Sequence, residues 1–380
     1  MKSCDVAIIG LGTMGSFTAL ELARRRVSVV GLDQFAPPHH RGSHSGETRV
    51  FRIAYYEHPD YVPLAQRSGL LWDGLSQEFG ATLLTRSGML SMGQEESELI
   101  SGVLKSSRLH NLDVETLSAT EIRRQFPALH PPHDFVGLLE KTAGWIDAGA
   151  SIRLGLKRAR VLGAELTLDN PVLGWESDGG QVKVKTQRDN LIARKLIITA
   201  GAWANQMLGD LGLPFTVRRK VIAWFDPLKP EQFEEGNIPI FAFAPNLVYG
   251  FPNIGGRGVK IGEHLGGNLV PDSNSPVVPP SSEDLDPLVQ AASRVLPTLI
   301  GPWPSRDVRL LRAMTCLYTK TPDEHFIIDQ HPRRENVFFA AGFSGHGFKF
   351  APVIAEALAD LALVGKTTLP VDFLRLRRRF

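Results

Sequence analysis

The amino-acid sequence predicts a protein of the α/β (α+β) class that is built from two structural units, each discontinuous along the chain. Strand and helix patterns alternate at both ends of the chain and in its middle, and antiparallel β-type segments lie between them. The chain has 380 residues, of which 43% are hydrophobic, and this is enough for two substantial cores.

The first elements form a predicted strand–helix–strand crossover. Residues 6–9 are a short apolar run, typical of a strand buried on both faces of a parallel sheet. A helix is expected over 14–26 and a second strand over 27–32. Farther along, the patterns predict helices over 60–79, 97–108 and 350–363, strand-rich stretches over 82–92, 166–199, 217–262 and 337–341, and a turn at 178–180.

A glycine pattern stands between the first strand and the first helix. Gly10, Gly12 and Gly15 match the dinucleotide-binding fingerprint in the context that it requires. The glycines permit a tight turn, a close approach of a pyrophosphate and close helix–strand packing, and the helix N-terminus then faces the phosphates. Asp33, at the end of the second strand, is expected to accept hydrogen bonds from the adenosine ribose. The first unit is therefore predicted to be Rossmann-like, although this pattern alone does not separate NAD from FAD.

A polar loop rich in glycine and histidine follows at residues 39–46, and it suits a ligand better than a core. Just beyond this loop, Arg49 and Arg52 stand three residues apart. On a helix or a tight turn, this spacing would place both side chains on one side. Guanidinium groups bind planar anions such as a carboxylate or the edge of a flavin ring. On spacing alone, a pair of surface arginines is the simpler interpretation.

The β-type region holds a lysine and a histidine in register. Alternation along a strand would place Lys260, Gly262 and His264 on one face. This arrangement suits a pocket wall, and an exposed strand face explains it about equally well. Tyr249 could lie on a neighbouring strand and supply an aromatic wall with a hydroxyl group.

A second glycine-rich turn precedes the last predicted helix. Gly342, Gly345 and Gly347 alternate with small and aromatic residues, which allows the backbone to approach a flat ligand closely. Lys349 is expected in the first helical turn, where a cation is unfavourable for helix stability. That mismatch favours anion binding over a generic turn.

Cys316 is the cysteine with a candidate role. A free cysteine is most often a small buried apolar residue. If its segment folds back onto the glycine loop, however, the thiol could be bonded to the cofactor, which points to a flavin rather than a nicotinamide. Cys4 is the only other cysteine, so a disulfide framework is excluded and a cytoplasmic location is expected.

The charge balance excludes other function classes. The 42 basic and 40 acidic residues give a net charge of +2, which creates no field favouring nucleic acid or an anionic membrane. No apolar run is long enough to span a bilayer, and the start of the sequence does not read as a cleavable leader. The basic run 375–379 is interpreted as a solvated end.

Together these residues resemble the monomeric sarcosine oxidase and N-methyl-L-amino-acid (N-methyltryptophan) oxidase family, within the D-amino-acid oxidase-like flavoproteins. The resemblance covers nearly the whole chain. It rests on the fingerprint with Asp33 and on the runs 42–52, 249–252, 260–264, 316–318, 322–329 and 342–350. It implies FAD-dependent oxidation of a secondary amine in a small N-methyl or cyclic amino acid to an imine, with dioxygen reduced to hydrogen peroxide.

The resemblance also implies roles for individual residues. Cys316 would carry FAD through an 8α-S-cysteinyl thioether. Arg52 and Lys349 would hold the substrate carboxylate. Lys260 would stand where dioxygen is reduced, and Arg49 would lie against the other face of the ring. The remaining implied positions are Tyr249, His264 and Tyr318 in the substrate pocket, and Gly10, Gly12, Gly15, Asp33, Ser43, Thr48, Gly342, Gly345, Gly347, Phe348 and Lys349 around FAD.

The same resemblance implies a monomer that uses an amino-acid substrate and dioxygen and holds no metal. A Rossmann-like FAD-binding domain would consist of residues 1–80, 145–213 and 309–380, and a discontinuous antiparallel-sheet substrate domain of residues 81–144 and 214–308. The chain departs from its family at His44-Ser45, where relatives carry two adjacent histidines. The missing basic group would change the redox tuning of the flavin but not the choice of cofactor.

Three alternatives stay open at this point. The first is a flavin amine dehydrogenase of the same fold that passes electrons to an acceptor other than oxygen. The second is a nicotinamide-dependent dehydrogenase, which leaves the segments around Cys316 and Lys349 unexplained. The third is a non-catalytic or nucleic-acid-associated flavoprotein, and only the basic tail supports it.

Overall fold

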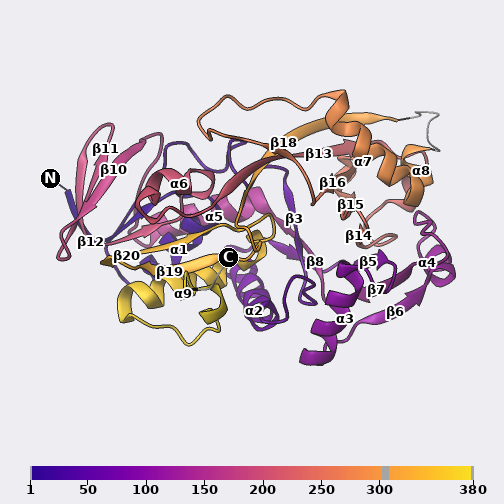
Figure 1. The fold of residues 1–380 in the computed structure, drawn as a ribbon, viewed down its shortest axis with the longest axis horizontal. Helices are drawn as coiled ribbons and strands as arrows, with labels where there is room; N and C mark the ends of the chain where they lie inside the picture. Colours follow the sequence, from indigo (N-terminus) through magenta and orange to yellow (C-terminus); the bar gives the residue numbers. More distant parts are fainter. Residues whose placement is uncertain (1, 302–307, 378–380) are drawn as a thin grey trace.

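The computed structural model describes residues 2–301 and 308–377, and within these ranges the strands form three sheets (Figure 1). The first sheet has eight strands: β1 (Lys2–Ile9), β2 (Val29–Leu32), β9 (Glu165–Thr167), β10 (Val172–Ser177), β11 (Val182–Thr186), β12 (Asn190–Ile198), β19 (Ile327–His331) and β20 (Arg334–Ala341). Its centre is parallel, in the order β9–β2–β1–β12–β20. The antiparallel ribbon of β10 and β11 extends from the first half of β12.

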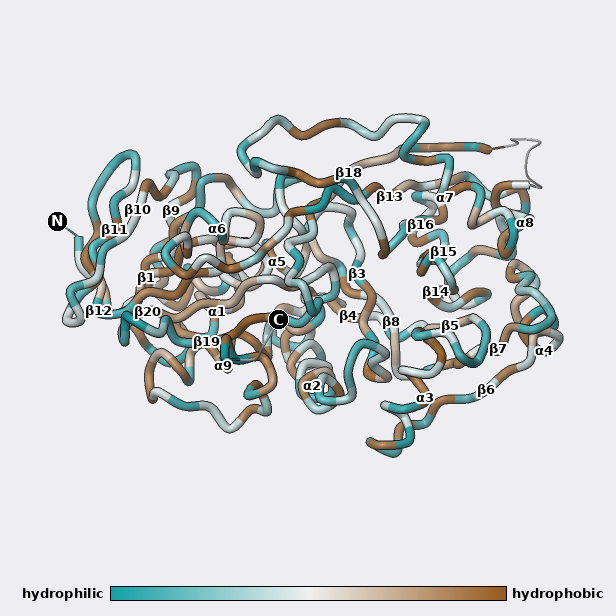
Figure 2. Tube along the Cα trace, in the orientation of Figure 1, coloured by the Kyte–Doolittle hydropathy of each residue, from teal (hydrophilic) through white to brown (hydrophobic). Residues whose placement is uncertain are grey.

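Helices cover one face of this sheet. Successive side chains of its buried strands point alternately into two cores, one on each face of the sheet. Val6 and Ile8 belong to the core shared with the helices, whereas Ala7 and Ile9 belong to the core on the opposite face. The hydropathy colouring shows this apolar centre clearly (Figure 2). The helices of this core are α1 (Thr13–Arg24), α2 (Tyr61–Phe79), α5 (Ala148–Val161) and α9 (Ala351–Val364).

The second sheet has nine strands: β5 (Met89–Gly93), β6 (Glu115–Ser118), β7 (Val136–Glu140), β13 (Thr216–Phe225), β14 (Ile240–Phe243), β15 (Val248–Asn253), β16 (Val259–Glu263), β17 (Asn268–Leu269) and β18 (Leu310–Lys320). Its neighbours are antiparallel except for β14 and β5. The small third sheet contains β3 (Thr48–Phe51), β4 (Leu84–Thr85) and β8 (Gly144–Asp147).

The helices beside the second sheet are α3 (Glu98–His110), α4 (Ala119–Gln125), α7 (Ser282–Val295) and α8 (Pro297–Ile300), whereas α6 (Ala204–Met207) packs against the first sheet. Short 3-10 turns occur at Gly201–Trp203, Gly209–Leu211, Pro230–Gln232, Ile254–Gly256, Phe348–Phe350 and Asp372–Leu374. Within the described ranges, none of the helices combines the length and apolarity needed to cross a membrane.

The predicted fold class is confirmed: a Rossmann-like parallel sheet stands beside a largely antiparallel one, and both are assembled from separated stretches of chain. The division into domains stays a prediction. The stretch 309–380 contributes to both sheets, because β18 pairs with β13 while β19 and β20 join the first sheet. In the basic tail, Arg375 pairs with Asp329, and the rest of the run beyond residue 377 lies outside the described residues.

Candidate cofactor and substrate site

The glycine fingerprint forms a turn in which side chains would not fit. Gly10 has φ +90°, a region that favours glycine. A Cβ on Gly15 would stand 1.7 Å from the carbonyl oxygen of Gly10, so α1 can lie this close to β1 only without a side chain there. The first turn of α1 contains no acidic residue, and no described side chain caps its amides. The turn therefore presents free backbone donors, as an anion site at a helix N-terminus requires.

Asp33 ends β2 and stabilises this turn. Its carboxylate accepts hydrogen bonds from the backbone N–H of Leu11 at 2.6 Å and of Phe35 at 2.8 Å. Burial raises the pKa of Asp33 to about 6, although these two N–H groups favour the ionised form. A carboxylate has about four acceptor positions, so lone pairs are left for a ligand hydroxyl.

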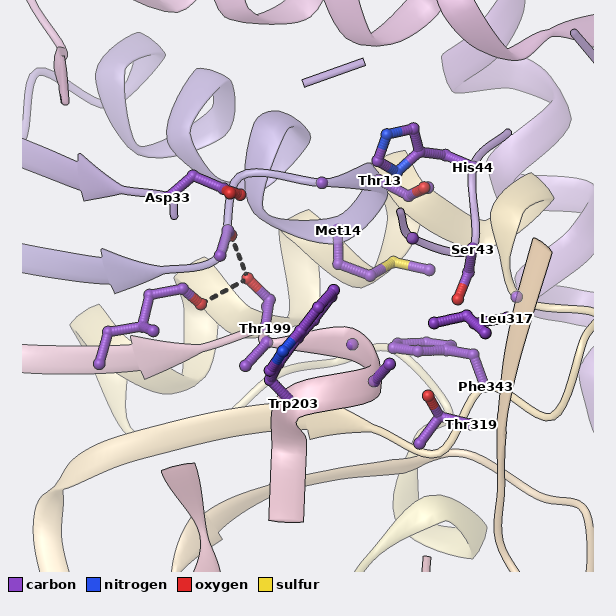
Figure 3. Close-up of a pocket in the computed structure, with 18 of the residues that line it drawn as sticks. Thr13, Met14, Asp33, Ser43, His44, Thr199, Trp203, Leu317, Thr319 and Phe343 are labelled. Carbon is purple, nitrogen blue, oxygen red and sulfur yellow. Dashed lines mark hydrogen bonds between the residues drawn. The ribbon is translucent and has the colours of Figure 1, made fainter. Parts of the chain in front are cut away.

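A cavity runs along the glycine turn and brings distant parts of the chain together. Gly10, Gly12 and Asp33 lie on its wall with Thr199 at the end of β12. Figure 3 shows that side chains of the C-terminal segment, including Leu317 and Phe343, border the same space. Of the residues predicted to surround FAD, Ser43, Arg49, Gly342, Gly345, Gly347 and Phe348 also line this cavity.

A second cavity adjoins the first. The two share Arg49, Tyr318, Gly345 and Phe348 as lining residues. The second one also contains Cys316, and its wall includes the predicted substrate residues Arg52, Tyr249, His264 and Lys349, together with Thr48. The fold thus gathers most of the predicted positions into two neighbouring cavities.

The local structure of Arg49 and Arg52 differs from the prediction. The spacing would have placed both side chains on one side of a helix or tight turn, but residues 48–51 form the extended strand β3, which pairs with β8 from about 100 residues downstream. Arg49 donates hydrogen bonds at 2.8 Å to the carbonyl oxygens of Thr48 and Ser43, and it also contacts the carbonyl oxygen of Ser45. It is therefore held at the junction of the two cavities.

Arg52 is already engaged by a carboxylate. Its Nη2 atom lies 2.5 and 2.6 Å from the two carboxylate oxygens of Glu57, and its guanidinium stands 4.0 Å from the centre of the Tyr55 ring. Burial alone would raise the pKa of Glu57, but Arg52, with help from His346, lowers it to about 2. The pair is thus ionised and buried, and a substrate carboxylate would have to share Arg52 with Glu57.

Lys349 lies just before α9, in the turn Phe348–Phe350, and not in the first turn of the helix as expected. Its side chain is buried, and its Nζ donates to the carbonyl oxygen of His346 at 2.8 Å and to the hydroxyl of Tyr55 at 3.3 Å. Burial, and then the nearby charge of Arg52, hold its pKa well below the usual range. An anion entering this cavity would favour the charged form of Lys349.

His346 connects this lysine to a loop. Its Nε2 lies 3.0 Å from the carbonyl oxygen of Glu324, and a carbonyl can only accept, so Nε2 carries the proton. The Nδ1 atom therefore accepts from the Tyr55 hydroxyl, 2.7 Å away. Burial lowers the pKa of His346 to about 4, so the imidazole is neutral near pH 7.

Tyr249, Tyr318 and His264 form an uncharged wall. Tyr249 lies on β15 opposite Gly262 of β16, which confirms the predicted neighbouring strand. Its hydroxyl forms a hydrogen bond with that of Tyr318, and burial raises the pKa of both phenols, that of Tyr249 to about 12. Burial lowers the pKa of His264 to about 3. All three side chains are therefore neutral at physiological pH.

Lys260 and His264 do not share one pocket wall. The Nζ of Lys260 donates to the carbonyl oxygens of Gly46 at 3.0 Å and Thr48 at 2.8 Å, and to the Thr48 hydroxyl at 2.5 Å. It also lies 3.9 Å from the centre of the Phe251 ring, in a small cavity separate from that of His264. Burial holds its pKa well below the usual range. Lys260 thus supports the backbone that precedes Arg49.

Cys316 lies on β18 opposite Lys220 of β13, and it is only 4% exposed. Burial raises the pKa of its thiol, but Arg49, Lys220 and Lys260 partly offset this. Thiolate reactivity depends on such positive surroundings. The thiol is therefore buried, and its pKa is raised overall although three basic side chains oppose the rise.

The departure at His44-Ser45 has a clear local structure. Burial lowers the pKa of His44 to about 3, and its Nε2 accepts from the backbone N–H of His39 at 2.9 Å. The Ser45 hydroxyl donates to the carbonyl oxygen of Thr315 at 3.0 Å, next to Cys316 in the sequence. Ser45 thus links the loop to β18 without adding charge.

Sequence reasoning missed Glu57, Tyr55 and a role for His346. Glu57 is one of 40 acidic residues and follows two tyrosines, with no pattern that marks it. Its importance comes from contacts made after folding, which single-sequence motifs do not encode. For His346, the glycine-rich run that contains it was the available signal.

A family model described as "FAD dependent oxidoreductase" matches residues 5–361. The chain therefore belongs to this family, and it is a flavoprotein oxidoreductase. Its relatives include the monomeric sarcosine oxidase of Streptomyces avermitilis, 40% identical over 98% of this chain and 97% of that protein. The N-methyl-L-tryptophan oxidase of Salmonella typhimurium is 35% identical over 96% of this chain and 95% of that protein.

Solved structures agree with these relatives. NikD, described as an unusual amino acid oxidase essential for nikkomycin biosynthesis, has a TM-score of 0.86 and 25% identity, with 100% of both chains covered. The resemblance inferred from the motifs is thus confirmed at the level of family and fold.

Proposed function

We propose that this protein oxidises the secondary amine of a small N-methyl or cyclic amino acid, such as sarcosine, to an imine and passes the electrons to dioxygen, forming hydrogen peroxide. The observation that carries the proposal is a pair of buried basic side chains, Arg52 and Lys349, in a cavity that adjoins the one along the glycine turn. The names of the relatives, sarcosine oxidase and N-methyl-L-tryptophan oxidase, support the same substrate class.

FAD fits the first cavity on structural grounds. The turn at Gly10, Gly12 and Gly15 has no room for side chains and offers uncapped amides to a pyrophosphate, and Asp33 keeps acceptor positions for a ribose. The flavin-ring end of FAD would be surrounded by Ser43, Thr48, Arg49, Gly342, Gly345, Gly347, Phe348 and Lys349. When bound, FAD would supply the acceptor for the two electrons and the hydride equivalent of the amine.

The residues of the second cavity would prepare the amine. Arg52 and Lys349 would bind the substrate carboxylate and so fix the molecule, while Tyr249, Tyr318 and His264 would form a neutral wall. Glu57 offsets the charge of Arg52, and the substrate carboxylate would offset that of Lys349, so Arg49 at the junction of the two cavities would supply the remaining positive charge near the amine. Positive surroundings lower the pKa of an ammonium group, so the amine would lose the proton that blocks its oxidation.

We further propose that FAD is bound covalently through Cys316, and that the protein acts as a monomer in the cytoplasm. The position of the Cys316 thiol in the cavity that adjoins the one along the glycine turn, with basic side chains nearby, supports the first point. The word "monomeric" in the names of relatives, and the two free cysteines in the described residues, support the others.

Changing Cys316 to serine is expected to abolish covalent attachment of FAD, because the alcohol is a far poorer nucleophile than a thiolate. After acid precipitation, the yellow colour should stay with the wild-type polypeptide and leave the variant. The matched control is Cys4→Ser, which removes a buried cysteine on β1 and should keep the colour bound. Colour that washes out of the wild type would refute the linkage.

Peroxide release on adding sarcosine, N-methyl or cyclic amino acids to the purified yellow protein tests the reaction itself. Slow reoxidation by air, with fast reduction of an added dye, would instead identify the amine dehydrogenase alternative. A protein without flavin absorbance that fails to take up FAD would contradict the proposal as a whole.

If Lys260 stands where dioxygen is reduced, changing it to methionine is expected to slow reoxidation of the flavin by dioxygen by on the order of 10²-fold, the effect of losing one preorganised donor. Stopped-flow absorbance can follow reduction by substrate under anaerobic conditions and reoxidation separately. Reduction should change little, and Lys260→Arg should restore part of the loss. Equal losses in both half-reactions would show that Lys260 only holds Gly46 and Thr48 in place.

A further inference from the structure

The lining of the second cavity contains two chemically different groups of side chains. The polar group includes Arg52, Glu57, His346 and Lys349. The apolar group is formed by Met89, Leu99, Ala242 and Leu247, which come from β5, α3, β14 and the approach to β15. Four elements thus contribute apolar side chains to one wall, which we call the apolar chamber.

The apolar chamber is part of one hydrophobic cluster. Met89, Leu99 and Ala242 belong to it as buried members, and Leu247 is partly buried against it. On β14 the alternation is strict: Ala242 faces the chamber, whereas Phe241 and Phe243 belong to the core on the other side of the sheet. At Ala242, the smallest of these side chains leaves the cavity open where a larger residue would fill it.

Sarcosine has no side chain that would occupy the apolar chamber. Its carboxylate would meet Arg52 and Lys349, and its nitrogen and methyl group would face the part shared with the first cavity, where Arg49 and Phe348 lie. Its Cα carries only hydrogen atoms. A ligand that leaves an apolar wall in contact with water forgoes the stabilisation that burial provides.

We infer that the substrate is an N-methyl amino acid with an apolar substituent at Cα, which the chamber lined by Met89, Leu99, Ala242 and Leu247 binds. This inference rests on the proposed function and names the substrate within its class. In a hydrophobic pocket, each added methylene changes kcat/KM by about 10- to 200-fold. The holoenzyme should therefore prefer N-methyl-leucine and N-methyl-phenylalanine to sarcosine by at least about 10-fold.

The measurement is anaerobic bleaching of the flavin absorbance by sarcosine, N-methyl-alanine, N-methyl-leucine and N-methyl-phenylalanine, which needs no particular electron acceptor. The inference is supported if the bleaching rate divided by the substrate concentration rises along this series. Equal rates, or a preference for sarcosine, overturn it while leaving the proposed function intact. If none of the substrates bleaches the flavin, the proposed function itself fails.

Variants at Ala242 locate the preference in the chamber. Ala242→Leu should lower kcat/KM for N-methyl-leucine and N-methyl-phenylalanine at least about 10-fold more than it lowers kcat/KM for sarcosine. Ala242→Gly should not lower it for the larger substrates. The control is Ala291→Leu on α7, which adds the same volume against the core on the opposite face of the sheet and should alter no preference.

A second variant that fills the apolar chamber keeps the test possible if Ala242→Leu does not fold. If Ala242→Leu fails to bind FAD, Leu99→Phe fills the same chamber from α3 and should produce the same selective loss. Flavin absorbance and the thermal midpoint establish that each variant is folded. Loss of activity in equal proportion for all substrates, in variants that bind FAD normally, would place the side chain elsewhere and overturn the inference.

Discussion

Gly15→Ala is expected to yield a protein that binds no FAD. The added methyl group would stand 1.7 Å from the Gly10 carbonyl oxygen and 2.7 Å from the Thr199 hydroxyl oxygen, so α1 must move away from β1. Such overpacking costs about 1–3 kcal/mol or more, and here it also displaces the amides that would hold the pyrophosphate. Flavin absorbance after purification with added FAD, together with the thermal midpoint, measures both effects.

Gly74→Ala is the matched control for this variant. Gly74 lies inside α2, and apart from its chain neighbours and the nearby backbone of that helix, no atom would lie within 4 Å of its Cβ. Alanine in the interior of a helix is favourable relative to glycine by roughly 0.5–1 kcal/mol, so this variant should be yellow and equally or more stable. A yellow Gly15→Ala protein with an unchanged thermal midpoint would contradict the proposed pyrophosphate site.

Arg52→Met is expected to cause the second large effect, on both binding and stability. Truncating one partner of a buried hydrogen-bonded charge pair costs about 2–5 kcal/mol, so kcat/KM should fall by at least about 30-fold. The fall should come mainly from KM if Arg52 binds the substrate carboxylate. Glu57 would stay buried without its partner, and the free energy of unfolding near neutral pH should fall by about 3–5 kcal/mol.

The pH dependence of stability gives a sign test for this variant. In the wild type the pKa of Glu57 is lowered from 4.5 to about 2, so its contribution is present above 4.5 and is lost as the pH falls toward 2. In Arg52→Met the burial of Glu57 is left without its main compensation, which raises that pKa. The variant should therefore lose stability as the pH rises above about 4.5, whereas in the wild type the pair adds stability as the pH rises from about 2 to 4.5 and its contribution is level above that.

Adding Glu57→Gln to Arg52→Met should restore stability but not substrate binding. Urea unfolding and steady-state kinetics on the two variants separate these quantities. If Arg52→Met retained the wild-type KM, the role of Arg52 would be to pair with Glu57 and not to bind the substrate.

The parts of the molecule that follow from local sequence agreed with prediction. The glycine turn and α1 need only residues 10–15 and their flanking apolar runs, and the helix expected at 60–79 is observed at Tyr61–Phe79. Likewise, the turn predicted at 178–180 connects β10 and β11. In each case the information lies within a few residues, where propensity and turn chemistry act.

The parts that depend on contacts between distant segments of the chain did not follow from the sequence. The strand that carries Arg49 is held by its pairing with β8, and the spacing of the two arginines alone did not indicate a strand. The Arg52–Glu57 pair, the contacts of Lys349 and the separation of Lys260 from His264 arise from packing among elements that lie far apart in the chain. Such contacts fix charge and protonation, and a single sequence does not contain them explicitly.

The cavity along the glycine turn takes its walls from the start, the middle and the end of the polypeptide. Any molecule that fills it acts as a common partner for segments that would otherwise separate more easily, and its occupancy raises the stability of the native state by mass action. A tether to Cys316 would change the character of this linkage: a ligand that cannot leave has no free concentration, so dilution would no longer weaken its hold on the fold.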